Sequence, residues 1–180
     1  MNIQTFRQYA KDHKQEFINL YGLPIVYLHV TAGDYDTTFN DYHFNITGDG
    51  DIMLTRDITE RPNHATYMRN TGSIAITLCC CKDAIAYADG GCNLGDYPPT
   101  DAQMNSLAQM IAILSDEFEF PITKEYVMTH GEAADIDGYG LYSGDSDCRW
   151  DLQFLSNDGE YDEGGRTIRG NAIFYQEQWR

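Results

Sequence analysis

Two histidines, far apart in the chain, each stand at the end of an apolar segment. His29 closes the run "IVYLH" and His130 closes the run "PITKEYVMTH". Polar sequence with glycines follows both, and the stretch after His130 adds several carboxylates and one thiol. Two imidazoles with one carboxylate or thiolate, and one position left for water, make up a catalytic zinc site. The alternative is that both are hydrogen-bonded structural residues, since their spacing is not a motif of the HExxH kind.

The elements that must position these histidines are strands and two helices. Apolar residues at helical spacing predict a helix over residues 2–20, and the turn signal "TGDG" between 42–46 and 51–55 predicts a β-hairpin. The β-branched run 73–80 is typical of a central strand. The run 121–130 is expected to be the last strand.

A second long helix is predicted after the glycine-rich loop that ends in "CNLGDYPP". Thr100 can cap it and Gln103 can complete a capping box. The order of elements predicts an α/β fold with a central mixed β-sheet flanked by helices. In such sheets, side chains from separate strands converge at the strand ends. The tail from about residue 156 is turn-rich and acidic, and no fold is predicted for it.

Composition restricts the classes of function. The chain has 180 residues, 42% of them hydrophobic, which fits one folded domain over 1–180. A formal charge of −16 argues against nucleic acid as a partner. The sequence shows neither a signal peptide nor a membrane span, so we expect synthesis in the cytoplasm. Consecutive Cys79, Cys80 and Cys81 are expected to be free buried thiols.

Five segments resemble, in order, a known enzyme family. They are "IVYLHVTAG", "DYHFNITGDGDI", "NTGSIAITL", "PPTDAQMNSLAQMIAIL" and "VMTHGEAA" with the later "DCRWDL". This order is similar to that of the zinc-dependent N-acetylmuramoyl-L-alanine amidases of type 2, which include phage endolysins and the peptidoglycan recognition proteins. The resemblance covers about residues 24–152, which leaves 153–180 as a C-terminal extension of unknown role.

The resemblance implies a Zn²⁺ site with three protein ligands. His29 in "LHVTA" matches the first ligand and His130 in "THGE" matches the second. Asp145 is the preferred third ligand, because its distance from "WD" matches the branch of the family with an Asp ligand. The proline that commonly follows this ligand is replaced by Ser146. The alternatives for the third ligand are Asp147, Cys148 and Asp151.

Further site residues follow from the same resemblance. Tyr42, in "YHF", matches a catalytic Tyr of the phage enzymes. Ser143, two positions before Asp145, stands where those enzymes have Lys, and its hydroxyl could assist by hydrogen bonding. His64 and Asn70, in "NHATYMRN", are expected to line the substrate groove. For His64, a loop residue bonded to backbone is an equal alternative.

Two neighbouring polar residues receive other interpretations. His43 should face away from Tyr42, since adjacent strand residues alternate, and is expected to be structural. Glu132 is interpreted either as an acceptor for an imidazole N–H of a ligand or as a solvated loop carboxylate.

The resemblance implies hydrolysis of the amide between N-acetylmuramic acid and L-alanine of the stem peptide. The leading hypothesis is a phage or prophage endolysin that acts on the cell wall after release, with a holin as a partner for export. The alternatives are a non-catalytic peptidoglycan-binding module and a cytoplasmic enzyme that recycles muropeptides. A structural α/β domain without metal is the remaining alternative.

Overall fold

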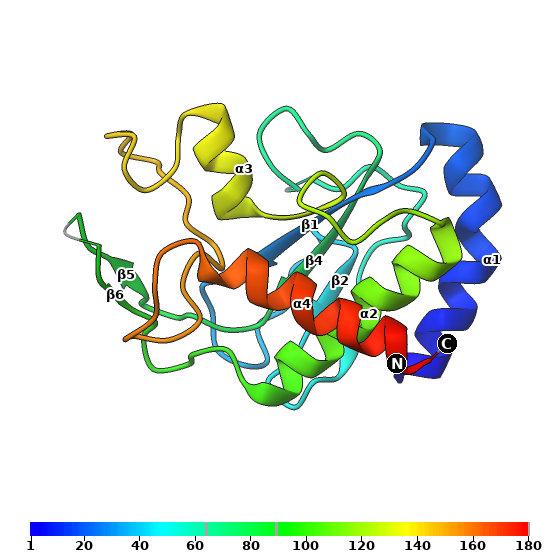
Figure 1. The fold of residues 1–180 in the computed structure, drawn as a ribbon, viewed down its shortest axis with the longest axis horizontal. Helices are drawn as coiled ribbons and strands as arrows, with labels where there is room; N and C mark the ends of the chain where they lie inside the picture. Colours follow the sequence, from blue (N-terminus) through cyan, green and yellow to red (C-terminus); the bar gives the residue numbers. More distant parts are fainter. Residues whose placement is uncertain (64, 89, 180) are drawn as a thin grey trace.

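A computed structural model describes residues 1–63, 65–88 and 90–179, and its centre is a five-stranded sheet (Figure 1). The strand order is β3-β2-β4-β1-β7. β4 pairs in parallel with β1 and β2, β1 pairs in parallel with β7, and edge strand β3 runs antiparallel to β2. The expected mixed sheet is therefore confirmed. The strands are β1 (Ile25–Val30), β2 (Phe44–Ile46), β3 (Ile52–Leu54), β4 (Ser73–Leu78) and β7 (Val127–Thr129).

Four helices and a small hairpin in the described residues surround this sheet. In Figure 1, α2 and α4 lie side by side in front of the sheet, and α1 stands at one end. The hairpin lies at the opposite end from α1 (Figure 1). The elements are α1 (Ile3–Tyr21), α2 (Asp101–Phe118), α3 (His130–Asp137), α4 (Glu163–Gln178), β5 (Ile85–Ala86) and β6 (Cys92–Asn93).

The two predicted helices, α1 and α2, begin where the sequence predicts. Asn2 caps α1 by accepting a hydrogen bond from the Thr5 amide. Thr100 and Gln103 form the predicted capping box at the start of α2, with bonds of 3.0 and 3.1 Å. Such caps satisfy amides that have no partner within the first turn of a helix. The predicted hairpin and central strand are also confirmed.

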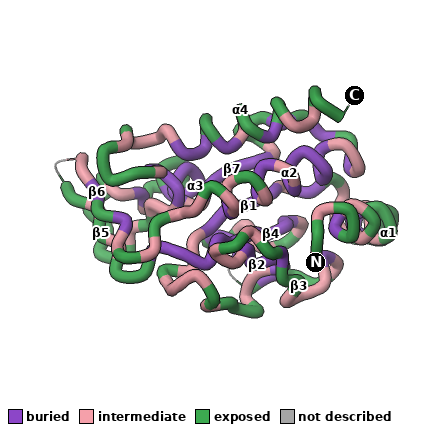
Figure 2. The backbone as a smooth tube through the Cα atoms, turned by 90° about the horizontal axis from the view of Figure 1, so that it is seen from below, coloured by how far each residue is buried: buried purple, intermediate pink, exposed green. Residues whose placement is uncertain are grey.

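The two faces of the sheet bury different residues. Val26 and Leu28 of β1 belong to the main core, together with apolar side chains of α2. Tyr27, between them, belongs to a smaller cluster with Ala75 of β4. Because strand side chains alternate, His29 lies on the same face as Tyr27. Figure 2 shows that β1, β7 and α2 are buried along most of their length.

The second half of the chain differs from the prediction at one strand and contains a helix that was not predicted. The expected strand 121–130 shortens to β7, because residues before it form turns in which the Tyr126 and Val127 amides bond to the Thr123 carbonyl. His130 therefore begins α3, whose capping box is built from Thr129 and Glu132. The tail for which no fold was predicted contains α4.

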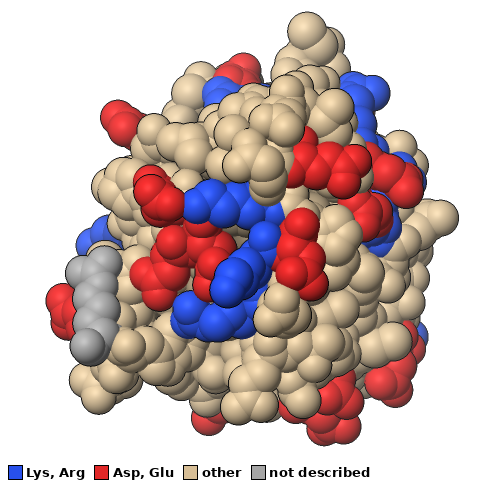
Figure 3. Space-filling model, turned by 90° about the vertical axis from the view of Figure 1, so that its right-hand side faces the viewer, with Lys and Arg blue, Asp and Glu red and all other residues tan. Residues whose placement is uncertain are grey.

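The surface carries paired charges. Around α1, Arg7 lies 3.3 Å from a Glu117 oxygen and Lys14 lies 2.6 Å from a Glu119 oxygen of the α2 end. Figure 3 shows basic groups bordered by acidic ones on one face. Cys79, Cys80 and Cys81 are buried and free, as predicted. In the described part of the chain, no helix is long and apolar enough to cross a membrane.

Candidate active site

The two strand-end histidines meet at one edge of the sheet. β1 and β7 are parallel neighbours with Leu28 opposite Thr129, so the residues that follow, His29 and His130, lie next to each other. Their ring centroids are 4.9 Å apart, at 66° to one another. The convergence predicted from the strand ends is therefore confirmed.

Asp151 completes a group of three with these histidines. One carboxylate oxygen lies 3.7 Å from His29 Nδ1 and the other lies 3.6 Å from His130 Nδ1. The Val30 amide donates to the same carboxylate, and the Gly131 amide donates to the Asp151 carbonyl. Asp151 is thus fixed by hydrogen bonds from the residue that follows each histidine.

This group fits a divalent metal ion by its donors and their spacing. The three donor atoms lie within 4.8 Å of one another. Tetrahedral ligands at zinc distances of 2.0–2.2 Å would be roughly 3.4 Å apart, close to the two carboxylate–imidazole separations. The set of two imidazoles and one carboxylate also occurs in catalytic zinc sites that keep a position open for water. The residues therefore could hold such an ion.

Electrostatics favour the ionised form of Asp151. Burial alone would raise the pKa of its carboxyl group, but His130 and His29 outweigh burial and hold the pKa well below its usual range. Asp151 and His130 keep 14% and 15% of their side-chain surface exposed, against 1% for His29. The group is therefore open to solvent on the side of His130 and Asp151.

Tyr42 lies beside the group, as expected for a catalytic Tyr. Its ring centroid is 4.9 Å from that of His29. Burial raises the pKa of the Tyr42 hydroxyl, and the Asp151 carboxylate raises it further. Tyr42 consequently stays protonated at neutral pH and can donate a hydrogen bond.

Two cavities meet at this group. The smaller, of about 380 Å³, is lined by Tyr42, His130 and Asp151 among others. The larger, of about 780 Å³, is lined by His130 and by residues of the 61–70 loop and the 137–149 segment. Arg149 also lines both cavities, so they adjoin at the candidate ligands.

The sequence of this chain matches a known protein family. The sequence model of N-acetylmuramoyl-L-alanine amidases matches residues 18–148. The chain belongs to the N-acetylmuramoyl-L-alanine amidase family. It is an enzyme that hydrolyses an amide bond of peptidoglycan.

The amidase is similar to the solved structure of an endolysin N-acetylmuramoyl-L-alanine amidase, LysCS from Clostridium intestinale URNW. The match has a TM-score of 0.45 at 18% identity and covers 61% of this chain and 70% of that chain. No curated protein sequence matches the chain significantly.

The structure of the amidase brings Asp151, rather than the preferred Asp145, to the two histidines. Among the described residues, the group of possible metal ligands contains neither Asp145 nor the alternatives Asp147 and Cys148. The exposed carboxylate of Asp145 accepts a hydrogen bond of 2.8 Å from the Asp147 amide and lines the larger cavity. Spacing selected Asp145, whereas the path of the chain brings Asp151 against β1 and α3.

Ser143 makes hydrogen bonds within its own loop. Its hydroxyl donates to the Gly140 carbonyl at 2.6 Å and accepts from the Asp145 amide at 3.1 Å. Among the described residues that line the two cavities, Ser143 is not included. The suggested assistance from its hydroxyl therefore has no geometric support.

The expected substrate-binding residues lie in the loop before β4. Asn70 lines the larger cavity, and its side-chain oxygen accepts from the Ala65 and Thr66 amides at 3.0 and 3.1 Å. It thereby also fixes the shape of that loop. His64 lies outside the described residues.

A network that the sequence did not reveal reaches the second histidine. Tyr139, just beyond α3, has its hydroxyl 3.4 Å from His130 Nε2 and 2.8 Å from the Thr66 hydroxyl. Because the other nitrogen, Nδ1, faces Asp151, Tyr139 can fix the ring orientation of His130. No spacing rule singles out Tyr139, since it contacts His130 through the turn that follows the helix.

Two polar residues near the site have structural roles. His43 is fully buried, accepts from the Ala75 amide at 2.9 Å and bonds the Glu60 carbonyl at 2.8 Å. This agrees with its expected structural role. Neither interpretation of Glu132 holds, because it is 1% exposed and its carboxylate binds Arg169 and the Thr129 amide. Burial opposes ionisation of Glu132, but Arg169, the Thr129 amide and Lys124 together outweigh it and lower the pKa of the carboxyl group.

Proposed function

We propose that the amidase is zinc-dependent and cleaves the bond between N-acetylmuramic acid and L-alanine of the stem peptide. The observation that carries the proposal is the group of His29, His130 and Asp151, with all donor atoms within 4.8 Å beside an open cavity. These three residues would hold the ion. A zinc ion there would lower the pKa of a coordinated water to about 7 and polarise the substrate carbonyl.

The protein's own contribution to the reaction comes from Tyr42 and Asp151. Tyr42 donates its hydroxyl hydrogen to the carbonyl oxygen of the scissile amide as negative charge develops there. Such a preorganised donor contributes on the order of 10²–10³ in rate. Asp151, ionised beside two imidazoles, contributes one negative charge, so a site with a divalent ion keeps a net positive charge.

The larger cavity supports binding of a peptide with charged groups. Its volume of about 780 Å³ is that of a ligand-sized groove, and it adjoins His130. Its charges are mixed, because Arg61 and Arg149 line it together with Asp137, Asp145 and Asp147. We propose that the arginines bind carboxylates of the stem peptide, so that the amide reaches Tyr42.

The test is digestion of purified sacculi by the purified protein, with and without a chelator. The expected result is new L-alanine amino termini, their loss on chelation and their return with added Zn²⁺. New reducing ends without new amines would refute the proposal. Metal analysis by mass spectrometry distinguishes the amidase from a binding module, and soluble anhydro-muropeptides as an alternative substrate distinguish it from a recycling enzyme.

A role in cell lysis is a finer proposal. It is supported by the Tyr42 motif, which resembles that of phage enzymes. If the protein is an endolysin, cytoplasmic expression leaves cells intact until a holin or another agent permeabilises the membrane, after which the culture clears. Clearing should be absent in a His29→Ala variant. A culture that stays turbid after permeabilisation of cells with the unaltered protein would refute this role.

A further inference from the structure

Glu132 connects the first turn of α3 to two other elements. It lies two residues after His130 and is 1% exposed. Both carboxylate oxygens accept hydrogen bonds of 2.8 Å from the Arg169 guanidinium of α4. One oxygen also accepts from the Thr129 amide at 3.0 Å. The helix that carries His130 is therefore bonded at its beginning to α4.

Arg169 joins three elements through one guanidinium group. Besides Glu132 of α3, it donates to the Val127 carbonyl of β7 at 2.9 Å. Arg169 keeps 11% of its side chain exposed, so the pair with Glu132 is largely shielded from water. α4 approaches closely because Gly165 faces the Glu132 carboxylate, where an added Cβ would lie 2.5 Å from the carboxylate atoms.

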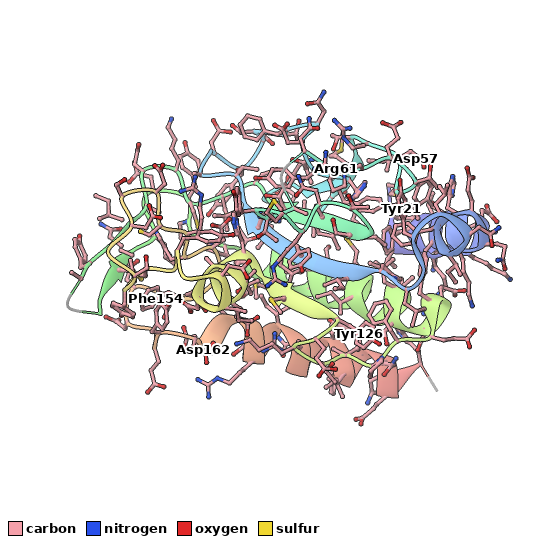
Figure 4. The ribbon with its side chains drawn as sticks, turned by 90° about the horizontal axis from the view of Figure 1, so that it is seen from above. Tyr21, Asp57, Arg61, Tyr126, Phe154 and Asp162 are labelled. Atoms are coloured by element: carbon pink, nitrogen blue, oxygen red, sulfur yellow. The ribbon has the colours of Figure 1, made fainter. Side chains whose placement is uncertain are left out.

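The segment between Asp151 and α4 makes a second connection to α3. Asp135 accepts hydrogen bonds from Gln153 at 2.6 Å and from the Tyr161 hydroxyl at 2.8 Å. Gly131 lies directly against Gln153, where a Cβ would clash. Figure 4 labels Phe154 and Asp162 on the stretch that leads into α4. The chain beyond residue 151 thus follows α3 along its length.

We propose that Arg169 is a positioning residue for His130. By bonding Glu132 and β7 together, it holds the first turn of α3 so that His130 Nδ1 faces Asp151. The proposal rests on the proposed function, in which His130 is a metal ligand. It also gives a role to the C-terminal extension, because the family match ends at residue 148 and α4 begins at Glu163.

The position of a ligand has a measurable consequence for metal binding. Residues that orient metal ligands typically change metal affinity by about 10–100-fold when altered. A purely structural pair would instead lower stability and leave the affinity of the folded protein unchanged. Zinc affinity of the folded protein therefore separates the two roles.

The experiment compares Arg169→Gln with Arg166→Gln. Arg166 lies on the same helix, and its exposed guanidinium donates to the Asp162 carbonyl, so it provides a matched control. Zinc affinity is measured by competition with a chromophoric chelator, after circular dichroism has shown that each variant is folded. We expect Arg169→Gln to bind zinc about 10–100-fold more weakly and Arg166→Gln to stay within about twofold of the unaltered protein. Unchanged affinity in folded Arg169→Gln overturns the proposal.

Two further variants keep the test decisive if Arg169→Gln does not fold. Arg169→Lys keeps the charge but loses the bidentate contact with Glu132, so a smaller loss of zinc affinity is expected. The double variant Glu132→Gln with Arg169→Gln leaves no unpaired buried charge, and we expect it to fold with weakened zinc binding. Unaltered zinc affinity in both variants overturns the positioning role.

A readout without metal checks the same role. In the metal-free protein, hydrogen exchange of the α3 amides should accelerate in Arg169→Gln, while exchange in β1 stays unchanged. Equal exchange in α3 overturns the proposal. If the unaltered protein bound no zinc, the proposed function and this proposal would both be refuted. Retained affinity in folded Arg169→Gln would refute the positioning role alone.

Discussion

His29 and His130 contribute the same chemical group from two differently built regions. His29 lies inside β1, between parallel partners β4 and β7, and backbone hydrogen bonds fix its strand on both sides. His130 begins an eight-residue helix that depends on side-chain contacts to Tyr139 and, through Glu132, to α4. The sheet thus positions one histidine by local pairing, whereas residues much later in the chain position the other.

The largest expected effects come from removing the three candidate ligands. His29→Ala, His130→Ala and Asp151→Asn should each abolish zinc binding at micromolar metal and reduce amide hydrolysis to background. The physical reason is that each contributes one of three donor atoms that lie within 4.8 Å of one another. Metal analysis of the purified variants and the sacculus assay measure the two losses. The losses of zinc binding and of hydrolysis should be equally complete in His29→Ala and His130→Ala.

Asp145→Asn is the control for this set. The exposed side chain of Asp145 lies outside the candidate group and accepts from the Asp147 amide, so we expect near-normal zinc content. Loss of zinc in Asp145→Asn together with retention in Asp151→Asn would mean that Asp145 is the third ligand. The two histidines would then share Asp145, and not Asp151, as the third ligand of the metal site.

Tyr42→Phe should give the next largest effect. The hydroxyl can donate to the developing oxyanion, so its loss should reduce kcat by about 10²–10³-fold while zinc stays bound. Tyr42 packs against the ring of His29, and Phe preserves that packing. Activity and metal content of the same preparation are the measurements. A loss of zinc equal to the loss of activity would show that Tyr42 supports His29 instead of the reaction.

The sequence predicted that the two histidines meet, because each follows a strand of the same parallel pair. His29 and His130 follow from apolar strands that end in polar sequence, because parallel strands bring their carboxyl ends to one edge. Asp151 was only an alternative, since the position of a loop carboxylate depends on the whole path of residues 138–151. Hydrogen bonds to the Val30 and Gly131 amides set that path, and no periodicity reveals them.

The C-terminal helix shows a second limit of sequence patterns. Gly164 and Gly165 make the start of α4 resemble a turn, because glycine disfavours helix interiors. Both are needed, since a Cβ on either would collide with Leu152 or with the Glu132 carboxylate. The helix forms through packing on α2, with Ile168 and Ala172 buried. Tertiary contact overrides local propensity here.

Mild acid should lower the free energy of unfolding through His43, which is bonded to the sheet. Burial lowers the pKa of His43 to about 4, from 6.5, so the folded protein keeps this imidazole neutral. The unfolded chain binds a proton between these values, and stability should fall as pH decreases from about 6.5 to about 4. The full loss is about 3 kcal/mol. The Ala75 amide, which donates to His43, belongs to β4, the partner of β1.

Urea unfolding of the metal-free protein at pH 7 and pH 4.5 measures this loss. His43→Gln keeps an amide donor and acceptor but does not titrate, so its stability should depend less on pH by roughly 2 kcal/mol over this interval, which ends above pH 4. Other titrating groups are common to both proteins and cancel in the difference. Identical pH dependence of the two proteins would contradict a neutral buried His43.

The smallest expected effect concerns the hydroxyl that contacts His130 from the side opposite Asp151. Tyr139→Phe removes the partner 3.4 Å from His130 Nε2, and we expect zinc affinity to fall about tenfold, at the low end for such partners because the contact is long. Competition with a chelator measures it. Tyr139→Phe should leave the position of His29 unchanged, because strand pairing in the sheet fixes that residue.

A graded series separates this hydroxyl from its loop. Thr66→Val removes the hydrogen bond of 2.8 Å that orients the Tyr139 hydroxyl, so it should weaken zinc binding less than Tyr139→Phe does. Tyr67→Phe changes an exposed ring 6.5 Å from that of Tyr139 and should leave affinity unchanged. Equal losses in all three variants would mean that the loop as a whole supports His130. The position of His130 would then depend on the shape of the larger cavity rather than on one hydrogen bond.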